Sequence, residues 1–217
     1  MIVLIPCKSL RAGKSRLASC LDAGQRYSLC AYFLTRAIEL ALAVTSAERV
    51  RIITPDPEAV SVAARFSVPT FADNDRELNA ALASARDEIA SLTLPPQRLM
   101  ILPIDLPYAT ADAIAAAARS DADVLIASDE AGRGTNLLLL SPGAGRFRFA
   151  FGEESFGAHV RQARNAGLNL QILDDPRLAR DIDEPNQYAA WTKSASFPRR
   201  LMTPEGVVAP ARDAAMN

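Results

Sequence analysis

The stretch "MIVLIPCKSLRAGKSRL" (residues 1–17) runs from an apolar segment into a basic loop. Its first six residues are apolar on both faces, which is typical of a buried strand in a parallel sheet. Similar runs recur along the chain, and we expect strands at 1–6, 49–55, 68–72, 98–104, 122–128, 135–141 and 168–173. The pattern therefore predicts a sheet whose strands are largely buried.

Helical patterns separate most of these runs. Apolar residues at three- and four-residue spacing predict helices at 25–44, 57–66, 76–92, 110–119 and 154–166. Alternating strands and helices indicate an α/β fold: a mostly parallel, Rossmann-like sheet with helices on both faces. Ligands of such sheets bind beyond the carboxyl ends of the strands, so the loops of interest are 7–16, 73–79, 105–109, 129–135 and 181–186.

The length of 217 residues fits one domain, because domains commonly run to roughly 150 to 250 residues. We expect this domain over residues 1–192. Residues 193–217 contain three prolines and no sustained apolar period, so we expect a C-terminal tail or arm there.

Composition points to small soluble partners. The 24 basic and 25 acidic residues leave a formal net charge of -1, which provides no bulk field for nucleic acid or an anionic membrane. The first apolar run is too short for a signal peptide or a membrane span. Cys7, Cys20 and Cys30 show no metal-ligand spacing, and a reducing cytoplasm fits best. A homodimer through "YSLCAYFL" (27–34) or through the tail remains open.

The loop after the first strand is basic. "AGKSRL" (12–17) matches the end of a phosphate-binding P-loop, G-x-x-x-x-G-K-[ST], but Lys8 stands where the first glycine belongs. That glycine permits the turn with which a P-loop wraps a phosphate. We expect instead that Lys8, Lys14 and Arg16 bring positive side chains to a triphosphate. A solvated basic edge and a P-loop ATPase are the alternatives.

Two segments carry aspartates suited to a metal: "LMILPIDLPY" (99–108) with Asp105, and "LARDIDEPNQY" (178–188) with Asp181 and Asp183. We take the last two side chains to face opposite ways, so that only one joins Asp105. Magnesium bound with a nucleotide takes one or two carboxylates plus phosphate oxygens, which Asp105 and Asp183 can supply. Pro185 suits the start of a short helix. Turn aspartates without a metal are the alternative.

Five segments occur together in the order and spacing of a known family. They are "LIPCKSLRAGKSRL" (4–17), "LPIDLP" (102–107), "GRGTNLLLL" (132–140), "FRFAFGEESFGAHV" (147–160) and "RDIDEPNQY" (180–188). The chain resembles the 2-phospho-L-lactate and phosphoenolpyruvate guanylyltransferases of coenzyme F(420) biosynthesis. The resemblance covers about residues 1–192 and implies a Rossmann-like nucleotidyltransferase domain that uses GTP, Mg²⁺ and a small phosphorylated three-carbon acid.

The resemblance also implies roles for individual residues. Catalytic contacts to the GTP phosphates and the metal are expected from Lys8, Lys14, Arg16 and Asp105, and magnesium ligands are expected to be Asp105 and Asp183. The choice of Asp183 is ours, because it is nearer the turn at Pro185, and Asp181 stays open as the alternative. The family residues that contact the acceptor correspond to Thr135, Gly152 and Ser155. We add Arg133 and Asn79 as further substrate-binding residues, on their position in this sequence and not on the family pattern.

Two departures from the family pattern bear on the substrates. Arg76 and Glu77 precede "LNAAL" (78–82) where the family commonly has glycines, and Arg133 replaces a glycine beside the acceptor site. The added positive charge of Arg133 can pair with an additional carboxylate of the acceptor or change which acceptor is preferred. Phosphoenolpyruvate, 2-phospho-L-lactate and 3-phospho-D-glycerate therefore all remain candidates.

The implied reaction is attack of the acceptor phosphate on the α-phosphorus of GTP. A phosphate monoester has a second pKa near ~6, so no base is needed at neutral pH. We accordingly expect His159, the one histidine, on a helix surface without a catalytic role. Ser155 is expected near a helix start that favours an anion, with an ordinary N-cap as the alternative. A nucleotide-binding regulatory module without turnover is the non-enzymatic alternative.

Overall fold

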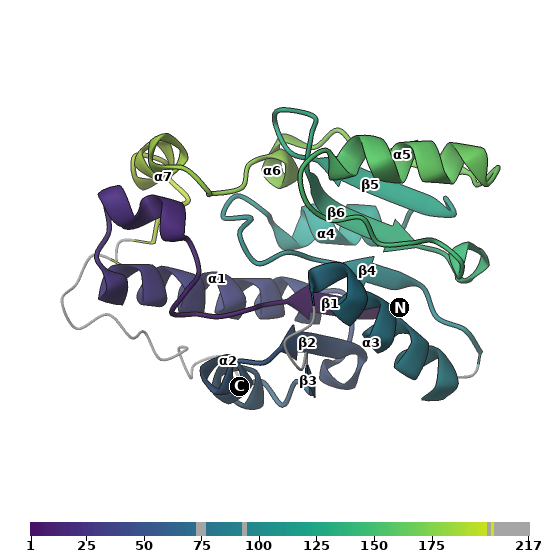
Figure 1. The fold of residues 1–217 in the computed structure, drawn as a ribbon, viewed down its shortest axis with the longest axis horizontal. Helices are drawn as coiled ribbons and strands as arrows, with labels where there is room; N and C mark the ends of the chain where they lie inside the picture. Colours follow the sequence, from purple (N-terminus) through teal and green to yellow (C-terminus); the bar gives the residue numbers. More distant parts are fainter. Residues whose placement is uncertain (73–76, 93–94, 199–200, 202–217) are drawn as a thin grey trace, which may run out of the picture.

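The computed structural model describes residues 1–72, 77–92, 95–198 and 201. These residues form a seven-stranded sheet in the order β3-β2-β1-β4-β6-β5-β7 (Figure 1). The strands are Ile2–Pro6 (β1), Val50–Thr54 (β2), Thr70–Ala72 (β3), Leu99–Ile101 (β4), Val124–Ser128 (β5), Thr135–Leu140 (β6) and Leu170–Ile172 (β7). Each lies within a segment for which the sequence predicts a strand.

One strand departs from the parallel arrangement. β6 runs antiparallel to both of its neighbours, β4 and β5, whereas the other paired strands are parallel. A short loop, residues 129–134, joins β5 to β6, as is possible only between antiparallel strands. The prediction of a mostly parallel, Rossmann-like α/β sheet is confirmed.

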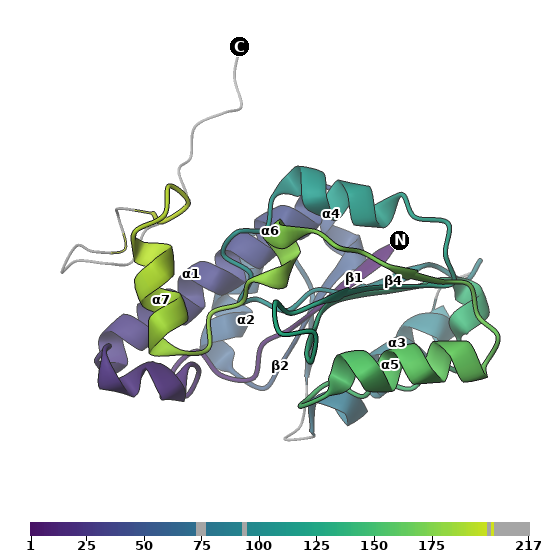
Figure 2. The same cartoon turned by 90° about the horizontal axis from the view of Figure 1, so that it is seen from above.

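Helices cover both faces of this sheet. Figure 2 shows the strands between the two layers, with α1 and α4 on one side and α3 and α5 on the other. The α-helices are Ala23–Leu42 (α1), Pro57–Ala64 (α2), Leu78–Leu92 (α3), Ala111–Ala118 (α4), Ser155–Asn165 (α5), Pro176–Ala179 (α6) and Pro185–Thr192 (α7). Short 3-10 helices span Ser15–Ser19 (η1), Ala47–Arg49 (η2) and Pro142–Ala144 (η3).

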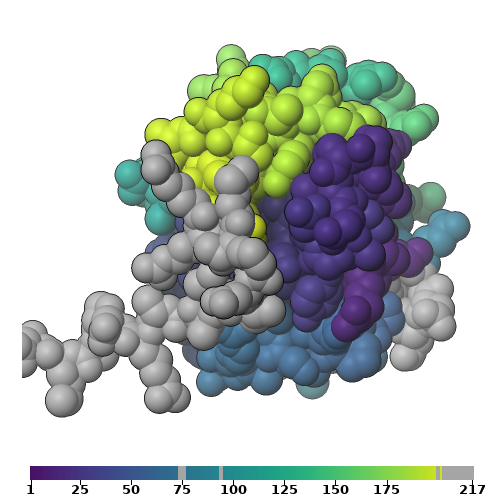
Figure 3. Space-filling view, turned by 90° about the vertical axis from the view of Figure 1, so that its left-hand side faces the viewer, coloured from purple at the N-terminus to yellow at the C-terminus, as the bar shows by residue number. Residues whose placement is uncertain are grey.

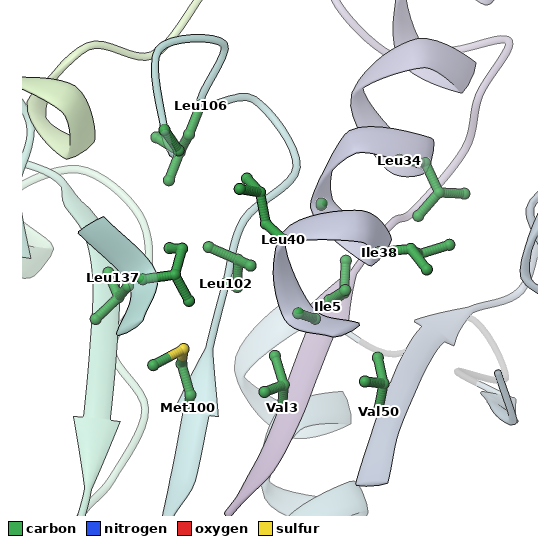
Figure 4. Packing of buried hydrophobic residues seen from close by; sticks show 14 of the residues in the cluster. Val3, Ile5, Leu34, Ile38, Leu40, Val50, Met100, Leu102, Leu106 and Leu137 are labelled. Carbon is green, nitrogen blue, oxygen red and sulfur yellow. The ribbon is translucent and has the colours of Figure 1, made fainter. Parts of the chain in front are cut away.

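The core has one apolar layer on each face of the sheet. Side chains of a strand alternate between faces, so Val3 and Ile5 of β1 join α1, α2 and α4, whereas Ile2 and Leu4 join α3 and α5. Figure 4 shows Val3 and Ile5 on the face of the sheet that packs against α1. Because both layers are filled, the polar groups of the site lie outside them, in loops and at the ends of strands and helices.

A third apolar cluster joins the N-terminal part of the chain to α7. Leu17 of η1, Phe33 of α1 and Trp191 of α7 are fully buried in it, and the rings of Phe33 and Trp191 lie 5.5 Å apart between centroids. Figure 3 shows the purple N-terminal segment and the yellow C-terminal segment side by side. This cluster brings residues far apart in sequence to the same end of the sheet.

The apolar residues that suggested a dimer face are used within the chain. Leu29 and Phe33 belong to the third cluster, and Cys30 and Leu34 to the layer beneath α1. The homodimer stays a prediction.

Only the beginning of the expected tail falls within the described residues. The ring of Phe197 packs against Trp191 at 4.8 Å between centroids, so this beginning is attached to the third cluster. The limits 1–192 and 193–217 stay predictions. Across the described part of the chain, no helix combines the length and apolar character required to cross a membrane.

Candidate active site

The site lies where the order of the strands reverses. β1 pairs with β2 on one side and with β4 on the other, although β4 comes later in the chain than β3. Open α/β sheets bind ligands at such a point, beyond the carboxyl ends of the strands. Two loops meet here: residues 7–14 after β1 and residues 102–110 after β4.

The first of these loops is anchored to α2. The carboxylate of Asp56 accepts a hydrogen bond from the backbone N–H of Leu10 at 2.7 Å. Its other oxygen accepts one from the backbone N–H of Glu58 at 2.8 Å and so caps α2. One aspartate therefore fixes both the helix start and the path of the loop.

Gly13 and Lys14 complete the loop in a constrained conformation. A Cβ atom at Gly13 would lie 2.7 Å from the Sγ atom of Cys30 on α1, so the close approach requires glycine. Lys14 has a left-handed backbone, with φ 53° and ψ 39°, which non-glycine residues adopt only where their surroundings enforce it. A 3-10 helix, not an α-helix, follows Lys14. The loop is therefore not a P-loop.

The ammonium of Lys14 bridges the two predicted metal ligands. Its Nζ atom donates to Asp105 Oδ2 and to Asp183 Oδ1, both at 2.7 Å, and its side chain is only 8% exposed. Burial by itself lowers the pKa of Lys14, but the charges and hydrogen bonds of the two aspartates outweigh it and raise that pKa above its ordinary value. Lys14 is therefore positively charged at neutral pH.

Asp181 joins the same group, contrary to expectation. One carboxylate oxygen from each of Asp105, Asp181 and Asp183 lies within 4.8 Å of the others. The idea that Asp181 and Asp183 face opposite ways is wrong, because positions two apart in an extended chain share a face. Ile182 between them turns the other way into the third cluster and is 1% exposed. Its backbone N–H bonds to Asp105 O at 3.2 Å, which aligns the two segments.

The surroundings of Asp181 disfavour its charged form. Burial and then the negative charges of Asp105 and Asp183 raise the pKa of Asp181 to about 6. Such crowding of carboxylates in a half-buried position is relieved when a cation binds between them. Oxygen ligands of this kind suit Mg²⁺, so the three aspartates fit the magnesium ion expected from the sequence.

A second group of predicted residues lies at the β5–β6 loop and the start of α5. Thr135 is the first residue of β6 and is buried, and Gly152 has a positive φ of 135° that favours glycine. Ser155 is the first residue of α5 and is also buried, while Glu154 occupies the N-cap position. The alternative of Ser155 as an ordinary N-cap is therefore wrong.

Backbone contacts connect these segments. The backbone N–H of Phe156 donates to the carbonyl oxygen of Arg133 at 2.8 Å, which ties the β5–β6 loop to α5. The side chain of Asn79 donates to the carbonyl of Phe151 at 3.0 Å and accepts from its N–H at 2.7 Å. Asn79 thus holds the segment before Gly152, and its direct contact with substrate stays a prediction.

His159 is buried, so the expectation of a surface histidine is wrong. Its side chain is 0% exposed, and burial lowers the pKa of the imidazole to about 4. Thr135 Oγ1 lies 3.0 Å from its Nδ1 atom, and the backbone N–H of Ala150 donates to its Nε2 atom at 3.0 Å. The sequence carried a signal for this burial, because His159 is four residues from both Ser155 and Ala163 on the inner face of α5.

One cavity brings the two groups of residues together. It has a volume of about 890 Å³, within the usual size range of ligand sites. Predicted site residues among its lining are Arg16, Asp105, Asp183, Arg133, Thr135, Gly152 and Ser155. Asp181, the alternative to Asp183, also lines it, and so do Asn136 and Gln187, which were not predicted. Gln187 accepts hydrogen bonds from the backbone N–H groups of Asp183 and Glu184, both at 2.7 Å.

The remaining predicted residues lie outside this lining. Lys8 is exposed, Glu77 is exposed at the start of α3, and Arg76 lies outside the described residues. By contrast, Arg16 does line the cavity, and it forms an exposed ion pair with Glu184 at 3.2 Å. Lys14 contributes through the two aspartates that it holds.

The same fold occurs among known nucleotidyltransferases. A solved nucleotidyl transferase from Methanothermobacter thermautotroptrophicus matches with a TM-score of 0.59 and 14% identity, covering 88% of this chain and 95% of its own. This likeness concerns the fold. Sequence comparison defines the class of protein as a nucleotidyltransferase, because the matching family model and the relatives given next are guanylyltransferases.

Sequence comparison names the family within that class. The family model described as "Guanylyl transferase CofC like" matches residues 1–190, and the chain belongs to this family. The phosphoenolpyruvate guanylyltransferase of Rubrobacter xylanophilus is 33% identical over 206 residues, or 92% of this chain and 98% of its own. The enzyme of the same name from Chloroflexus aggregans is 35% identical over 205 residues, or 89% and 98%.

Proposed function

We propose that the protein transfers GMP from GTP to the phosphate of a small phosphorylated three-carbon acid and releases pyrophosphate. One observation carries the proposal: a single cavity is lined both by the metal-type aspartates and by Thr135, Gly152 and Ser155. The names of the two relatives suggest guanine as the base of the nucleotide and a phosphorylated three-carbon acid as the acceptor.

The charge of the cavity supports a cation in this function. Among the described residues that line it, eight are carboxylates and two are arginines, Arg16 and Arg133. A polyphosphate and a phosphorylated acid would be repelled by this lining unless a cation neutralised it. Asp105, Asp181 and Asp183 would hold Mg²⁺. When bound there, Mg²⁺ supplies positive charge to nucleotide oxygens.

The chemical step needs no base from the protein. An acceptor phosphate oxygen forms a bond to the α-phosphorus of GTP, and the bond to the oxygen leading to the β-phosphate breaks. The electron pair of that bond leaves with pyrophosphate. The attacking monoester is largely ionised at neutral pH because its second pKa is near ~6. His159 is consistent with this view, since both of its ring nitrogens are engaged within the protein.

The residues of the chain then act by binding and alignment. Arg16 of η1 lines the cavity and can donate hydrogen bonds to phosphate oxygens. Lys8 is exposed on the preceding loop and would add a second cation near them. Lys14 keeps Asp105 and Asp183 together. Ser155 at the start of α5 suits an anionic acceptor, because the helix dipole favours negative charge there.

Phosphoenolpyruvate is the first candidate acceptor, because both relatives carry its name. Arg133 lines the cavity and would sense an additional carboxylate or hydroxyl, so 2-phospho-L-lactate and 3-phospho-D-glycerate remain alternatives. Family membership supports a place in coenzyme F(420) biosynthesis. The cytoplasmic location stays a prediction.

The decisive experiment is pyrophosphate release by the purified protein with magnesium. Four nucleoside triphosphates are paired with the three acceptors, and the diphosphate bridge of the product is identified by phosphorus NMR. We expect release with GTP and one acceptor, and loss of release when magnesium is chelated. Tight GTP binding without release for any pair would refute the proposal and favour the regulatory module.

A further inference from the structure

We infer that His159 is a positioning residue that turns the hydroxyl of Thr135 into a hydrogen-bond donor aimed at the acceptor. The nature of the ligand in this inference rests on the proposed function. The position of the protons on His159 and Thr135 does not depend on it. The chain contains a single histidine, and the proposed transfer of GMP assigns it no part in binding or in the chemical step.

The two contacts of the imidazole determine where its proton lies. The backbone N–H of Ala150 can only donate, so the Nε2 atom that it reaches at 3.0 Å must offer a lone pair. A neutral imidazole then carries its hydrogen on Nδ1. The partner of Nδ1 is Thr135 Oγ1 at 3.0 Å, so the threonine oxygen accepts this bond.

The threonine hydroxyl must therefore direct its own hydrogen elsewhere. Its oxygen has no second hydrogen-bond partner among the described residues, and Thr135 lines the cavity. A buried hydroxyl hydrogen that points to a ligand oxygen contributes both affinity and orientation. With His159 in place, Thr135 presents a donor, which suits the negatively charged oxygens of a phosphorylated acid.

Packing keeps the imidazole from turning. The ring of Phe151 packs against the imidazole in a T-shaped arrangement and the ring of Phe147 packs at a tilt, with centroids 5.1 and 5.5 Å away. Phe151 is itself held by the two hydrogen bonds to Asn79. The donor direction of Thr135 is thus set by a rigid set of contacts that reaches from α3 to α5.

The first test is the tautomer of His159, which long-range proton–nitrogen NMR reads directly on nitrogen-labelled protein without a histidine tag. Because there is one histidine, no assignment is needed. We expect a neutral ring with hydrogen on Nδ1 at pH 7, before any ligand is added. Hydrogen on Nε2, or a charged ring, would overturn the inference. This readout is independent of turnover, so absence of transfer would count only against the proposed function.

The second test separates the two contacts of the ring. In His159→Asn the amide reaches roughly the position of Nδ1 and can still donate to Thr135, whereas in His159→Gln it reaches roughly that of Nε2 and can bond only to Ala150. We expect His159→Gln to raise KM for the acceptor about ten-fold, as for the loss of one hydrogen bond. His159→Asn should raise it less, and KM for GTP should change in neither.

Thr135→Val provides the matched background, since it removes the hydroxyl but keeps the shape. If His159 acts through that hydroxyl, the His159→Gln substitution should no longer raise the acceptor KM in Thr135→Val protein. Equal losses in the Asn and Gln variants, or a loss that persists in the Thr135→Val background, would show a merely structural role. If the His159 variants fail to fold, the NMR result on the unmodified protein decides.

Discussion

Replacing Lys14 by methionine tests the central ion pairs of the site. The ammonium is buried, whereas Asp105 is 24% and Asp183 44% exposed in their side chains. Removing one partner of a fully buried pair costs about 3–5 kcal/mol, and exposed pairs contribute at most about 1 kcal/mol. For this intermediate case we expect a loss of about 2 kcal/mol in the free energy of unfolding. In a chain of this size that lowers Tm by about 4–8 °C.

Magnesium should reverse part of this loss. In the unmodified protein the ammonium competes with a cation for oxygens of Asp105 and Asp183, whereas in Lys14→Met those oxygens are free. A ligand that binds only the folded state raises Tm in proportion to its affinity. We therefore expect magnesium to raise the Tm of Lys14→Met by more than that of the unmodified protein, even though transfer of GMP is severely reduced.

The assay is thermal unfolding followed by circular dichroism, with magnesium chloride compared against sodium chloride at equal ionic strength. Arg11→Met is the matched control, because Arg11 lies in the same loop and pairs with Glu58 at 2.6 Å but is exposed. It should leave both Tm and the magnesium response unchanged. An unchanged Tm in Lys14→Met would refute the energetic reasoning. A magnesium response no larger than that of the unmodified protein would refute metal binding by the three aspartates.

Three further substitutions test other parts of the site. Asp105→Asn should abolish pyrophosphate release while the circular dichroism spectrum stays the same, and near-normal turnover would remove Asp105 from the metal site. Gly13→Ala should lower the free energy of unfolding by about 1–3 kcal/mol because its Cβ would lie 2.7 Å from Cys30 Sγ. Adding Cys30→Ala should recover part of that loss, and no recovery in chemical denaturation would locate the strain elsewhere. Arg133→Gly should change KM for the acceptor more than KM for GTP in steady-state kinetics, and the reverse result would mean that Arg133 faces the nucleotide.

The elements of the fold were predictable because their signals are local. Apolar runs and three- to four-residue spacing recovered strands such as β1 and helices such as α5 within a few residues. The direction of β6 was not predictable. Its sequence "TNLLLL" (135–140) is buried on both faces, and such an apolar run looks the same whether the neighbouring strands are parallel or antiparallel. The short loop 129–134 was the available signal, since it is too short for a parallel crossover.

The sequence allowed many residues of the site to be predicted, but not the contacts between them. Asp105, Asp183 and Lys14 were selected from separate motifs, and the structure brings them together. Their pairing depends on sequence separations of 91 and 169 residues, which no local pattern encodes. Asp181 was taken as an alternative to Asp183, not as a companion, because of a mistaken assignment of side-chain direction. The burial of Ile182 between the two aspartates shows that both face the same way.

His159 illustrates where local reasoning ends and tertiary structure begins. Its spacing from Ser155 and Ala163 places it on the inner face of α5, so its burial follows from helical periodicity alone. A buried imidazole then requires a partner at each nitrogen, because an unsatisfied polar group in the core is costly. Which partners satisfy it depends on how β6 and the segment before α5 approach the helix. The identity of Thr135 as one of them, and with it the direction of a hydroxyl hydrogen in the cavity, therefore emerges only from the folded chain.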